Sequence, residues 1–435
     1  MTLSRRQFVS AGAALAAAGA AAPLQAGTAA PAPGATLPPA LASLSSITTG
    51  AQPIGAAERR ARRDKLGALM RHSGVDAVLI EPGSSLVYFT GIEWWISERI
   101  TAALIMADGG LAFITPAFEE DRLRELLDAQ AGAHAKTPAN VLTWEEDEDP
   151  FVLLGDWLKQ PSRKIKTIAL DEAVRHFIAH RLQQAAPDIR HTTAVGLVNG
   201  CRTVKSAAEL ALMQLAADVT VAAYRAVYPL VQAGMDNAAI AALMFQAQSR
   251  LGGDSPAGGA QVGKGSALPH GSKEPEYVAE GQVVLMDFGC SVGGYRSDIS
   301  RTFVFGEPNA EQRKLWQQVR RGQDIAFATA KPGTPAREVD IAVRSYYETL
   351  GYGPDYRLPG LSHRTGHGIG LDIHEPINFV RNEDTPLVAG MCLSNEPGIY
   401  IPGKYGVRLE DCLYITDEGP RWFSTPPERI DEPMG

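Results

Sequence analysis

Four acidic side chains occur as two pairs, and each pair flanks a glycine-containing turn between apolar runs. Asp287 and Asp298 are equidistant from the centre of the first turn, taken between Val292 and Gly293. A regular hairpin then places them directly opposite each other, with Cβ atoms about 5 Å apart. Glu396 and Glu410 have the same symmetry about a glycine in the second turn. Carboxylates this close in an apolar setting repel each other, so each pair requires a proton or a cation between its members.

A histidine with a glycine on each side, His367, lies between the two acidic pairs in the chain. The glycines allow the backbone to approach a site closely. Four carboxylates balance the charge of two divalent cations, and a mixed oxygen and nitrogen donor set suits Mn(II), Zn(II), Co(II) or Fe(II). Such a site can activate a water and stabilise the tetrahedral product of its attack. We therefore expect a dinuclear metal site with five ligands: Asp287, Asp298, His367, Glu396 and Glu410.

Separate salt bridges on unrelated strands are the alternative explanation. They could account for either acidic pair alone. They do not account for two symmetric hairpins together with the glycine-flanked histidine.

The elements that carry these residues lie in the C-terminal half. Apolar strands flank each turn, and the segments between them have the apolar periodicity of helices. Runs of strands and helices that do not alternate regularly indicate an α+β domain. The expected strands are 282–290, 295–305, 391–400 and 406–414, and the expected helices are 206–232, 237–251, 309–330 and 335–350.

The preceding region has a different pattern, in which helices alternate with short apolar strands. This alternation predicts an α/β domain. The expected helices are 58–73 and 119–133, and the expected strands are 76–80, 102–106 and 111–114. We place the boundary near 195–200, which gives an N-terminal domain at 56–197 and a C-terminal domain at 198–435.

The first residues have the features of an export signal. Arg5, Arg6 and Phe8 precede a short run of small and apolar residues, which predicts a twin-arginine signal peptide over 1–26. Residues 27–55 are rich in Ala, Pro, Gly, Ser and Thr, which predicts a flexible linker. We expect a periplasmic or secreted protein that folds before export.

Composition excludes several classes of protein. With 45% hydrophobic residues and a net charge of −8, the chain is neither disordered nor a dedicated nucleic-acid binder. It has no strongly apolar run of 18 residues, so we expect no membrane association once the signal is removed. Its four cysteines are too few for a disulfide scaffold, and we expect free buried thiols.

The motifs around the expected ligands closely resemble those of the pita-bread metallopeptidases, the family of Xaa-Pro aminopeptidases, prolidases and methionine aminopeptidases. The N-terminal region resembles the creatinase-type domain of the proline-specific branch more loosely, at Tyr88-Phe-Thr-Gly91. Ser300 stands where the family often has Thr. The matching stretches are Met-Asp287-Phe-Gly, Ser-Asp298-Ile-Ser-Arg-Thr-Phe, Arg-Thr-Gly-His367-Gly-Ile-Gly-Leu, Asn-Glu396-Pro-Gly-Ile-Tyr and Gly-Val-Arg408-Leu-Glu410-Asp.

The resemblance implies an α+β pita-bread catalytic domain, preceded by an α/β creatinase-type domain. It also implies roles for three further residues. His270 and His374 match substrate-facing histidines that donate to the carbonyl or oxyanion, and Arg408 matches an arginine near the glutamate pair. Without the resemblance, His270 could be a solvated loop histidine and His374 a paired core histidine. Arg408 could form an ion pair at a strand edge. His363 could compete with His367 as a ligand, but we expect it beside the site or at the surface.

The function implied is hydrolysis of the Xaa-Pro bond at the N-terminus of short peptides by a hydroxide that bridges two metal ions. We expect Glu396 to relay the proton to the leaving nitrogen. We expect Mn(II), because a protein that folds before export loads its metal in the cytoplasm; Zn(II) and Co(II) are alternatives. The expected partners are short proline-containing peptides and further copies of the chain, in a homodimer or tetramer.

Several alternatives remain open from the sequence. The site does not distinguish an aminopeptidase P from a dipeptidase. A metal-independent creatinase-like hydrolase and a non-catalytic binding protein use the same fold, but the intact ligand set counts against both. A methionine aminopeptidase would be shorter and cytoplasmic.

Overall fold

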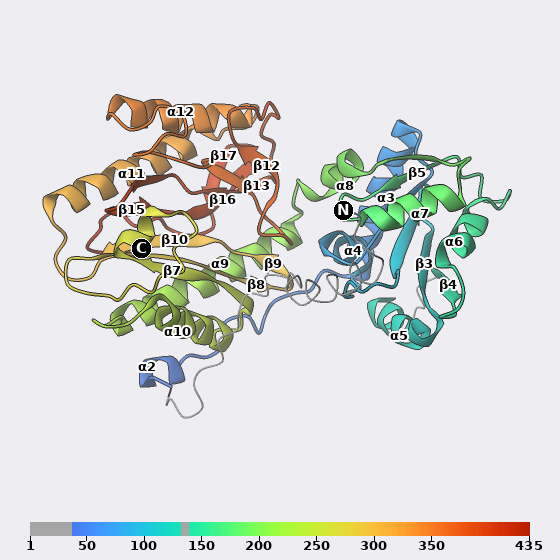
Figure 1. Cartoon of the computed structure of the whole chain (residues 1–435), viewed down its shortest axis with the longest axis horizontal. Coiled ribbons are helices and arrows are strands. Elements are labelled where there is room, and N and C mark those ends of the chain that lie inside the picture. Colours follow the sequence, from blue (N-terminus) through green and yellow to red (C-terminus); the bar gives the residue numbers. More distant parts are fainter. Residues whose placement is uncertain (1–36, 132–138) are drawn as a thin grey trace, which may run out of the picture.

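The computed structural model describes residues 37–131 and 139–435. The predicted signal peptide 1–26 and the first part of the linker lie outside the described residues. The chain forms two bodies side by side, one built around a single sheet and the other around several strands between pairs of helices (Figure 1). The mixture of helix and sheet agrees with the expected α+β class.

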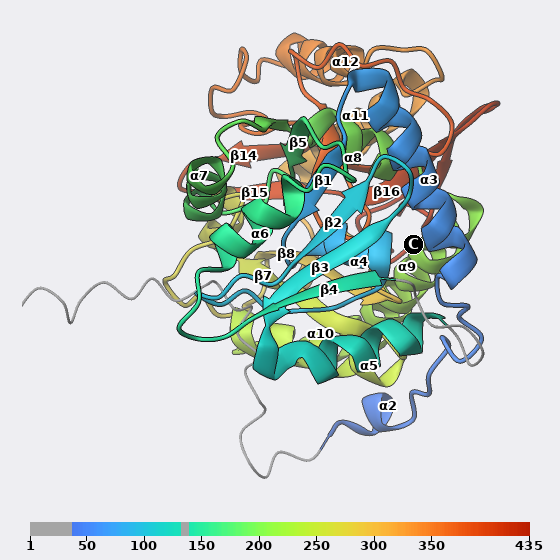
Figure 2. The ribbon, with the colours of Figure 1, turned by 90° about the vertical axis from the view of Figure 1, so that its right-hand side faces the viewer.

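The first domain contains a six-stranded mixed sheet in the order β4-β3-β2-β1-β5-β6 (Figure 2). Strand β1 pairs antiparallel with β2 and parallel with β5. Its elements are α3 (Ala56–Ser73), β1 (Ala77–Ile80), α4 (Ser84–Thr90), β2 (Ala102–Met106), β3 (Leu111–Pro116), η1 (Ala117–Glu119), α5 (Glu120–Ala131), β4 (Ala139–Trp144), α6 (Pro150–Leu158), β5 (Thr167–Leu170), α7 (His176–Ala185) and β6 (Arg190–Thr193).

The two faces of this sheet are both covered, which explains why its central strand is an unbroken apolar run. Val78 and Ile80 belong to the same hydrophobic cluster as residues of α3 and α5. Ala77 and Leu79, which point to the other face, pack with residues of α6 and α7. Helix α3 ends at Gly74, whose φ of 64° provides a left-handed cap.

The second domain follows α8 (Val195–Arg202) and has its helices outside its strands. Helices α9 and α10 share a hydrophobic cluster with β8, and α11 and α12 share another with β13 and β16. Its elements are α9 (Ala207–Val227), η2 (Tyr228–Leu230), α10 (Asn237–Arg250), β7 (Asp254–Val262), η3 (Gly263–Ala267), β8 (Val283–Val292), β9 (Tyr295–Arg296), β10 (Ile299–Val304), α11 (Ala310–Thr329), α12 (Ala336–Thr349), β11 (Gly366–Gly368), β12 (Glu375–Phe379), β13 (Cys392–Asn395), β14 (Gly398–Ile401), β15 (Tyr405–Arg408), β16 (Asp411–Thr416) and β17 (Gly419–Trp422).

The four long helices of this domain occur where the sequence predicts them, and polar caps define two of their starts. Ser206 and Glu209 form a reciprocal capping box at the start of α9, and Asn309 and Gln312 form another at α11. The segment Ala207–Leu230 is long and apolar enough to cross a membrane, but half of it is buried inside the protein. Its buried face packs on β8, as expected of a core helix.

The segment 37–55, predicted to belong to a flexible linker, instead docks on the second domain. It contains the short helix α2 (Pro39–Ala42), whose Leu41 is fully buried. Arg250 of α10 donates to the carbonyl of Ala42 (2.7 Å), and Thr48 donates to the carbonyl of Gly252 (3.0 Å). The prediction for this part is wrong because a few apolar residues anchor a segment whose average composition is that of a linker.

All four cysteines are buried and free, as expected. They are Cys201, Cys290, Cys392 and Cys412.

Candidate metal centre

The first acidic hairpin has a different register from the one predicted. The turn consists of Gly293 and Gly294, with φ of 57° and 85°, so Val292 pairs with Tyr295. Asp287 consequently pairs with Ser300 rather than with Asp298. The prediction that the two aspartates lie directly opposite each other is wrong, because the true turn centre lies one residue later.

Asp287 and Asp298 nevertheless remain diagonal neighbours on one face of the hairpin. The corrected register shifts the pairing by two residues, and a two-residue shift keeps a side chain on the same face. Asp298 lies in the irregular step between β9 and β10. A Cβ on Gly289 would lie 2.0 Å from the carbonyl oxygen of Ser297, so only glycine allows this close crossing.

The second acidic hairpin has the predicted register. Asn395 pairs with Asp411 in the β13–β16 ladder, and Gly398 pairs with Arg408 in the β14–β15 ladder. Both pairs are symmetric about Gly403, so the register is continuous. Glu396 and Glu410 therefore face each other in the gap between the two ladders.

The two hairpins meet at Ser300 and Glu410. The backbone N–H of each residue donates to the carbonyl of the other, at 3.2 and 3.1 Å. This bridge joins strands that are more than a hundred residues apart in the chain. It thereby brings both acidic pairs to one place.

His367 reaches the same place from β11. A Cβ on Gly366 would lie 2.1 Å from the carbonyl oxygen of Ser394, and one on Gly368 would lie 2.4 Å from that of Pro376. The two glycines thus let β11 lie tightly between β12 and β13. The prediction of a close backbone approach here is confirmed.

The hydrogen bonds of His367 fix its tautomer. Its Nδ1 lies 3.0 Å from the carbonyl oxygen of Gly368, which can only accept, so Nδ1 carries the proton. Its Nε2 lies 3.3 Å from Oε1 of Glu396 and 3.6 Å from Oδ2 of Asp298. Nε2 therefore presents a lone pair to the carboxylates, as a metal-ligating histidine does.

The structure brings all five predicted ligands together. Donor atoms of Asp298, His367 and Glu410 all lie within 4.8 Å of one another. Glu396 contacts His367, and Asp287 is close enough to raise the pKa of Asp298, Glu396 and Glu410.

Without cations, Asp298, Glu396 and Glu410 resist ionisation. Burial and then the neighbouring Asp287 raise the pKa of Asp298 well above its usual value. Burial and then Asp298 do the same for Glu410. Burial raises the pKa of Glu396 to about 7, although Arg408 opposes the shift. Burial lowers the pKa of His367 to about 3, so its ring is neutral.

Two divalent cations fit this donor set. Oε1 of Glu410 is buried and has no hydrogen-bond partner, so it is available to a cation. Four carboxylates and one neutral imidazole supply hard and borderline donors with the charge that two such ions require.

Arg408 connects the two hairpins behind the ligands. Its Nη2 donates to Oδ2 of Asp287 (2.6 Å), and its Nε donates to Oγ of Ser300 (3.1 Å). Ser300 in turn donates to Oε2 of Glu410 (2.7 Å). Arg408 is only 3% exposed, and these contacts orient the ligands.

The remaining donors of Arg408 extend this support. Nη1 donates to the hydroxyl of Tyr400 (3.2 Å) and to the carbonyl of Pro269 (2.9 Å), which precedes His270. The Tyr400 hydroxyl lies 2.8 Å from Nε2 of His363, whose Nδ1 donates to the carbonyl of Arg364 (2.7 Å). His363 is therefore fully partnered beside the site, as expected, and does not replace His367.

His270 and His374 are exposed on the open side of the centre. The ring of His374 lies edge-on to that of His367, with centroids 4.4 Å apart. The ring of His374 is partly covered by its neighbours, and this partial desolvation, followed by the charges of Arg364 and His270, lowers the pKa of His374. The two histidines thus flank the region in front of the ligands.

Sequence reasoning missed Tyr400, Arg364 and Ser394. Ser394 accepts from the backbone N–H of His367 (3.0 Å) and lies 3.3 Å from Oε1 of Glu396. All three lie inside or beside the motifs that hold the ligands. Position within those motifs was the signal that could have found them.

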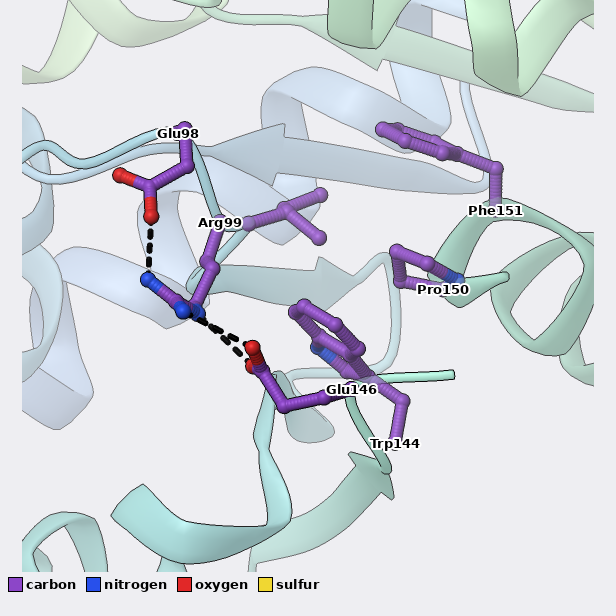
Figure 3. Close-up of a pocket in the computed structure, with 7 residues that line it drawn as sticks. Glu98, Arg99, Trp144, Glu146, Pro150 and Phe151 are labelled. Atoms are coloured by element: carbon purple, nitrogen blue, oxygen red, sulfur yellow. Dashed lines mark hydrogen bonds and ion pairs between the residues drawn. The ribbon is translucent and has the colours of Figure 1, made fainter. Parts of the chain in front are cut away.

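A separate cavity of about 250 Å³ lies in the first domain (Figure 3). The guanidinium of Arg99 lines this cavity. It donates to Glu98 and to both carboxylate oxygens of Glu146, at 2.7 and 2.8 Å. The cavity contains none of the predicted site residues. Its lining residues are Glu98, Arg99, Ile100, Trp144, Glu146, Pro150 and Phe151.

Both domains of the chain match known protein families, and the chain as a whole is similar to known peptidases. Residues 211–417 match Metallopeptidase family M24, and residues 62–204 match the Creatinase/Prolidase N-terminal domain. The chain is 31% identical over 368 residues to an Xaa-Pro dipeptidase of Lactobacillus helveticus, covering 83% of this chain and 96% of that protein.

Solved structures resemble the whole two-domain chain. Dipeptidase PepE from Mycobacterium ulcerans superposes with a TM-score of 0.78 at 28% identity, covering 87% of this chain and 98% of that one. The X-Pro aminopeptidase from Thermotoga maritima superposes with a TM-score of 0.72 at 28% identity, covering 85% and 98%. The arrangement of two domains is therefore shared along almost the full length of these proteins.

Proposed function

Because the chain belongs to metallopeptidase family M24, we propose that it hydrolyses the Xaa-Pro bond at the N-terminus of short peptides. The observation that carries the proposal is the convergence of Asp287, Asp298, His367, Glu396 and Glu410 at one buried centre. The relatives named as Xaa-Pro dipeptidase and X-Pro aminopeptidase supply the substrate class.

The five ligands would hold two divalent metal ions. When bound, such ions lower the pKa of water to make it a nucleophile and polarise the scissile carbonyl. The metal-independent and non-catalytic alternatives are disfavoured, because all four carboxylates and the histidine are present and lie together.

The protein's own side chains supply the remaining chemistry. Glu396 faces the reaction region beside His367, where it can take a proton from the nucleophilic water and pass it to the proline nitrogen. His374 and His270 border the same region and can donate to the developing oxyanion. Arg408 holds Asp287 and the turn before His270 in place.

We propose Mn(II) as the physiological metal. Support comes from the oxygen-rich donor set, and from the expected export of an already folded protein. Metal analysis of protein isolated from its native compartment tests this, and zinc as the dominant metal would overturn it.

We propose export by the twin-arginine route to the periplasm or beyond. Support comes from Arg5 and Arg6 ahead of an Ala-rich run. A fusion in which both arginines are replaced by lysine should remain in the cytoplasm. Export of that variant at the normal level would contradict the proposal.

We propose a homodimer or tetramer as the working state. Trp95 and Ile96 of the first domain are 44% and 56% exposed, which supports an association surface on this domain. Light scattering on purified protein tests it, and a monomer at micromolar concentration would contradict it.

An activity panel tests the function itself. We expect chelated enzyme supplied with Mn(II), Zn(II) or Co(II) to cleave Xaa-Pro dipeptides or Xaa-Pro-Xaa tripeptides. Preference for dipeptides identifies a dipeptidase, and preference for tripeptides identifies an aminopeptidase. Equal cleavage of Xaa-Ala peptides would overturn the proline specificity.

A further inference from the structure

Residues 369–374, the His374 loop, join β11 to β12 and end at the histidine that borders the metal centre. The loop has no helix or strand. Its first half is held to the second domain by three bonds to its backbone. The N–H of Arg296 donates to Gly370 (2.9 Å), Nε of Arg296 donates to the carbonyl of Leu371 (3.2 Å), and the N–H of Ile369 donates to Cys392 (3.1 Å). The second half depends on other contacts.

Glu375, directly after the loop, provides part of that support from inside the protein. It is 6% exposed. Its Oε1 accepts from the backbone N–H of Asp372 (3.2 Å) and from Nη2 of Arg202 (2.6 Å), and its Oε2 accepts from Nζ of Lys205 (2.8 Å). A Cβ on Gly370 would lie 2.8 Å from both oxygens, so the loop wraps closely around this carboxylate.

Asp372 connects the same loop to the first domain. Its Oδ1 accepts from the hydroxyl of Ser84 (2.5 Å), and its Oδ2 accepts from Nη2 of Arg202 (2.7 Å). Arg202 also donates through Nη1 to the hydroxyl of Ser85 (3.2 Å). Ser84 and Ser85 begin α4 of the first domain. The bridging cluster of Arg202, Lys205, Asp372 and Glu375 therefore spans the junction between the two domains.

The charges of the bridging cluster are balanced, and most of it is buried. The side chains of Arg202, Lys205 and Glu375 are 11%, 2% and 4% exposed, and that of Asp372 is 47% exposed. Burial alone would raise the pKa of Glu375, but Lys205 and Arg202 outweigh it and hold that pKa below its usual value. Buried ion pairs add little net stability over apolar packing, but they impose a defined geometry.

We propose that the bridging cluster positions His374: it fixes the His374 loop against the first domain, so that correct docking of that domain is required for His374 to face the substrate. Arg202 and Glu375 are thus positioning residues that act through His374. The role of His374 toward substrate rests on the proposed function, whereas the support of its loop does not.

Hydrogen exchange tests the support of the loop without relying on activity. Arg202→Lys keeps the charge but cannot contact Ser85, Asp372 and Glu375 together. In the metal-loaded protein, we expect amides of the His374 loop to exchange about tenfold faster in this variant. Unchanged exchange would overturn the proposal. Asp372→Asn, at the most exposed member of the cluster, is the second variant if Arg202→Lys does not fold.

Arg175→Lys is the matched control. Arg175 pairs with fully buried Glu81 inside the first domain, at 2.7 Å, and contacts no residue of the His374 loop. We expect this variant to lose stability but to leave exchange of the loop unchanged. Faster loop exchange in this control as well would show a general effect of destabilisation and would overturn the specific role of the cluster.

A double-mutant cycle tests whether the cluster acts through His374. We expect Arg202→Lys to lower kcat about tenfold with KM changed less than about twofold, and to have no further effect in a His374→Ala background. If the double variant instead loses kcat by the product of the two single losses, the two residues act independently and the proposal is overturned. If the wild type cleaves no Xaa-Pro peptide, the proposed function fails, and hydrogen exchange still decides the positioning.

Discussion

The hydroxyl group of Ser300 orients one of the carboxylates of the metal centre. The hydroxyl of Ser300 donates to the carboxylate of Glu410 and accepts from the guanidinium of Arg408. One oxygen atom therefore connects an expected metal ligand to a buried arginine. A threonine at this position would retain that oxygen, so the geometry of Glu410 does not depend on which of the two residues stands here.

We expect Ser300→Thr to retain metal binding and Ser300→Ala to weaken it. Alanine leaves a buried carboxylate oxygen and a guanidinium N–H unpaired, which costs about 1–3 kcal/mol of stability. Loss of such a supporting group typically lowers metal affinity about 10–100-fold. Urea unfolding and competitive metal titration of the two variants test this. Equal affinities in both variants would contradict the role of the hydroxyl.

We expect His374→Ala to lower kcat about 100-fold, as for loss of a group that donates in the transition state. Its metal content should remain at the wild-type level, because His374 is not a ligand. Steady-state kinetics with metal analysis of the same samples checks both statements. A loss of metal, or a kcat within about threefold of wild type, would refute this assignment.

At the level of elements, close crossings between strands shape the centre. Gly289 allows the irregular step before β10, because a Cβ there would meet the carbonyl of Ser297. Gly366 has the same function between β11 and β13. The five ligands come from five separate segments, in or directly beside strands, and these crossings bring the segments within reach of shared cations.

We expect Gly289→Ala to cost about 1–3 kcal/mol in unfolding free energy and to reduce metal content, because the strand must move away from Ser297. Gly259→Ala on the neighbouring strand β7 is the matched control, since a Cβ there has nothing within 4 Å. Thermal unfolding and metal analysis compare the two. Similar losses in both variants would mean that the crossing at Gly289 is not the cause.

The same elements show how far the sequence could predict the structure. The second hairpin was predicted correctly because its symmetry about Gly403 defines the register. The predicted pairing of the first is wrong by two residues, because the expected turn centre lies between Val292 and Gly293, whereas the two left-handed positions of the turn are taken by the two glycines, 293 and 294. The resemblance places Arg408 near the glutamate pair, and His363 is expected beside the site. Their individual partners could not be predicted, since those contacts join segments far apart in the chain.

At the scale of the whole molecule, the two domains are joined by buried polar groups as well as by apolar packing. Nη2 of Arg62, in α3, donates to the hydroxyl of Tyr295 (3.1 Å) and lies 3.4 Å from Oε1 of Glu209 in α9. One hydrophobic cluster includes residues of both domains. The first domain is therefore part of the frame that holds the catalytic elements.

Glu375, in the bridging cluster between the two domains, makes the stability of the protein depend on pH. The pKa of Glu375 lies below its usual 4.5, so its stabilising effect is complete above that pH and is lost as pH falls through the folded-state value. In chelated protein, we expect the stability gap between wild type and Glu375→Gln to be constant near neutral pH and to shrink below 4.5. Urea unfolding across this range measures it, and a gap that does not shrink would contradict the linkage.

Five converging side chains are proposed to hold two metal ions in a proline-specific hydrolytic centre. The most direct test is to titrate chelated enzyme with Mn(II) while measuring cleavage of an Xaa-Pro dipeptide and its Xaa-Pro-Xaa extension. We predict almost no activity without metal and a plateau at two equivalents per chain. Activity that persists in fully chelated enzyme, or a plateau at one equivalent, would contradict a dinuclear metal centre.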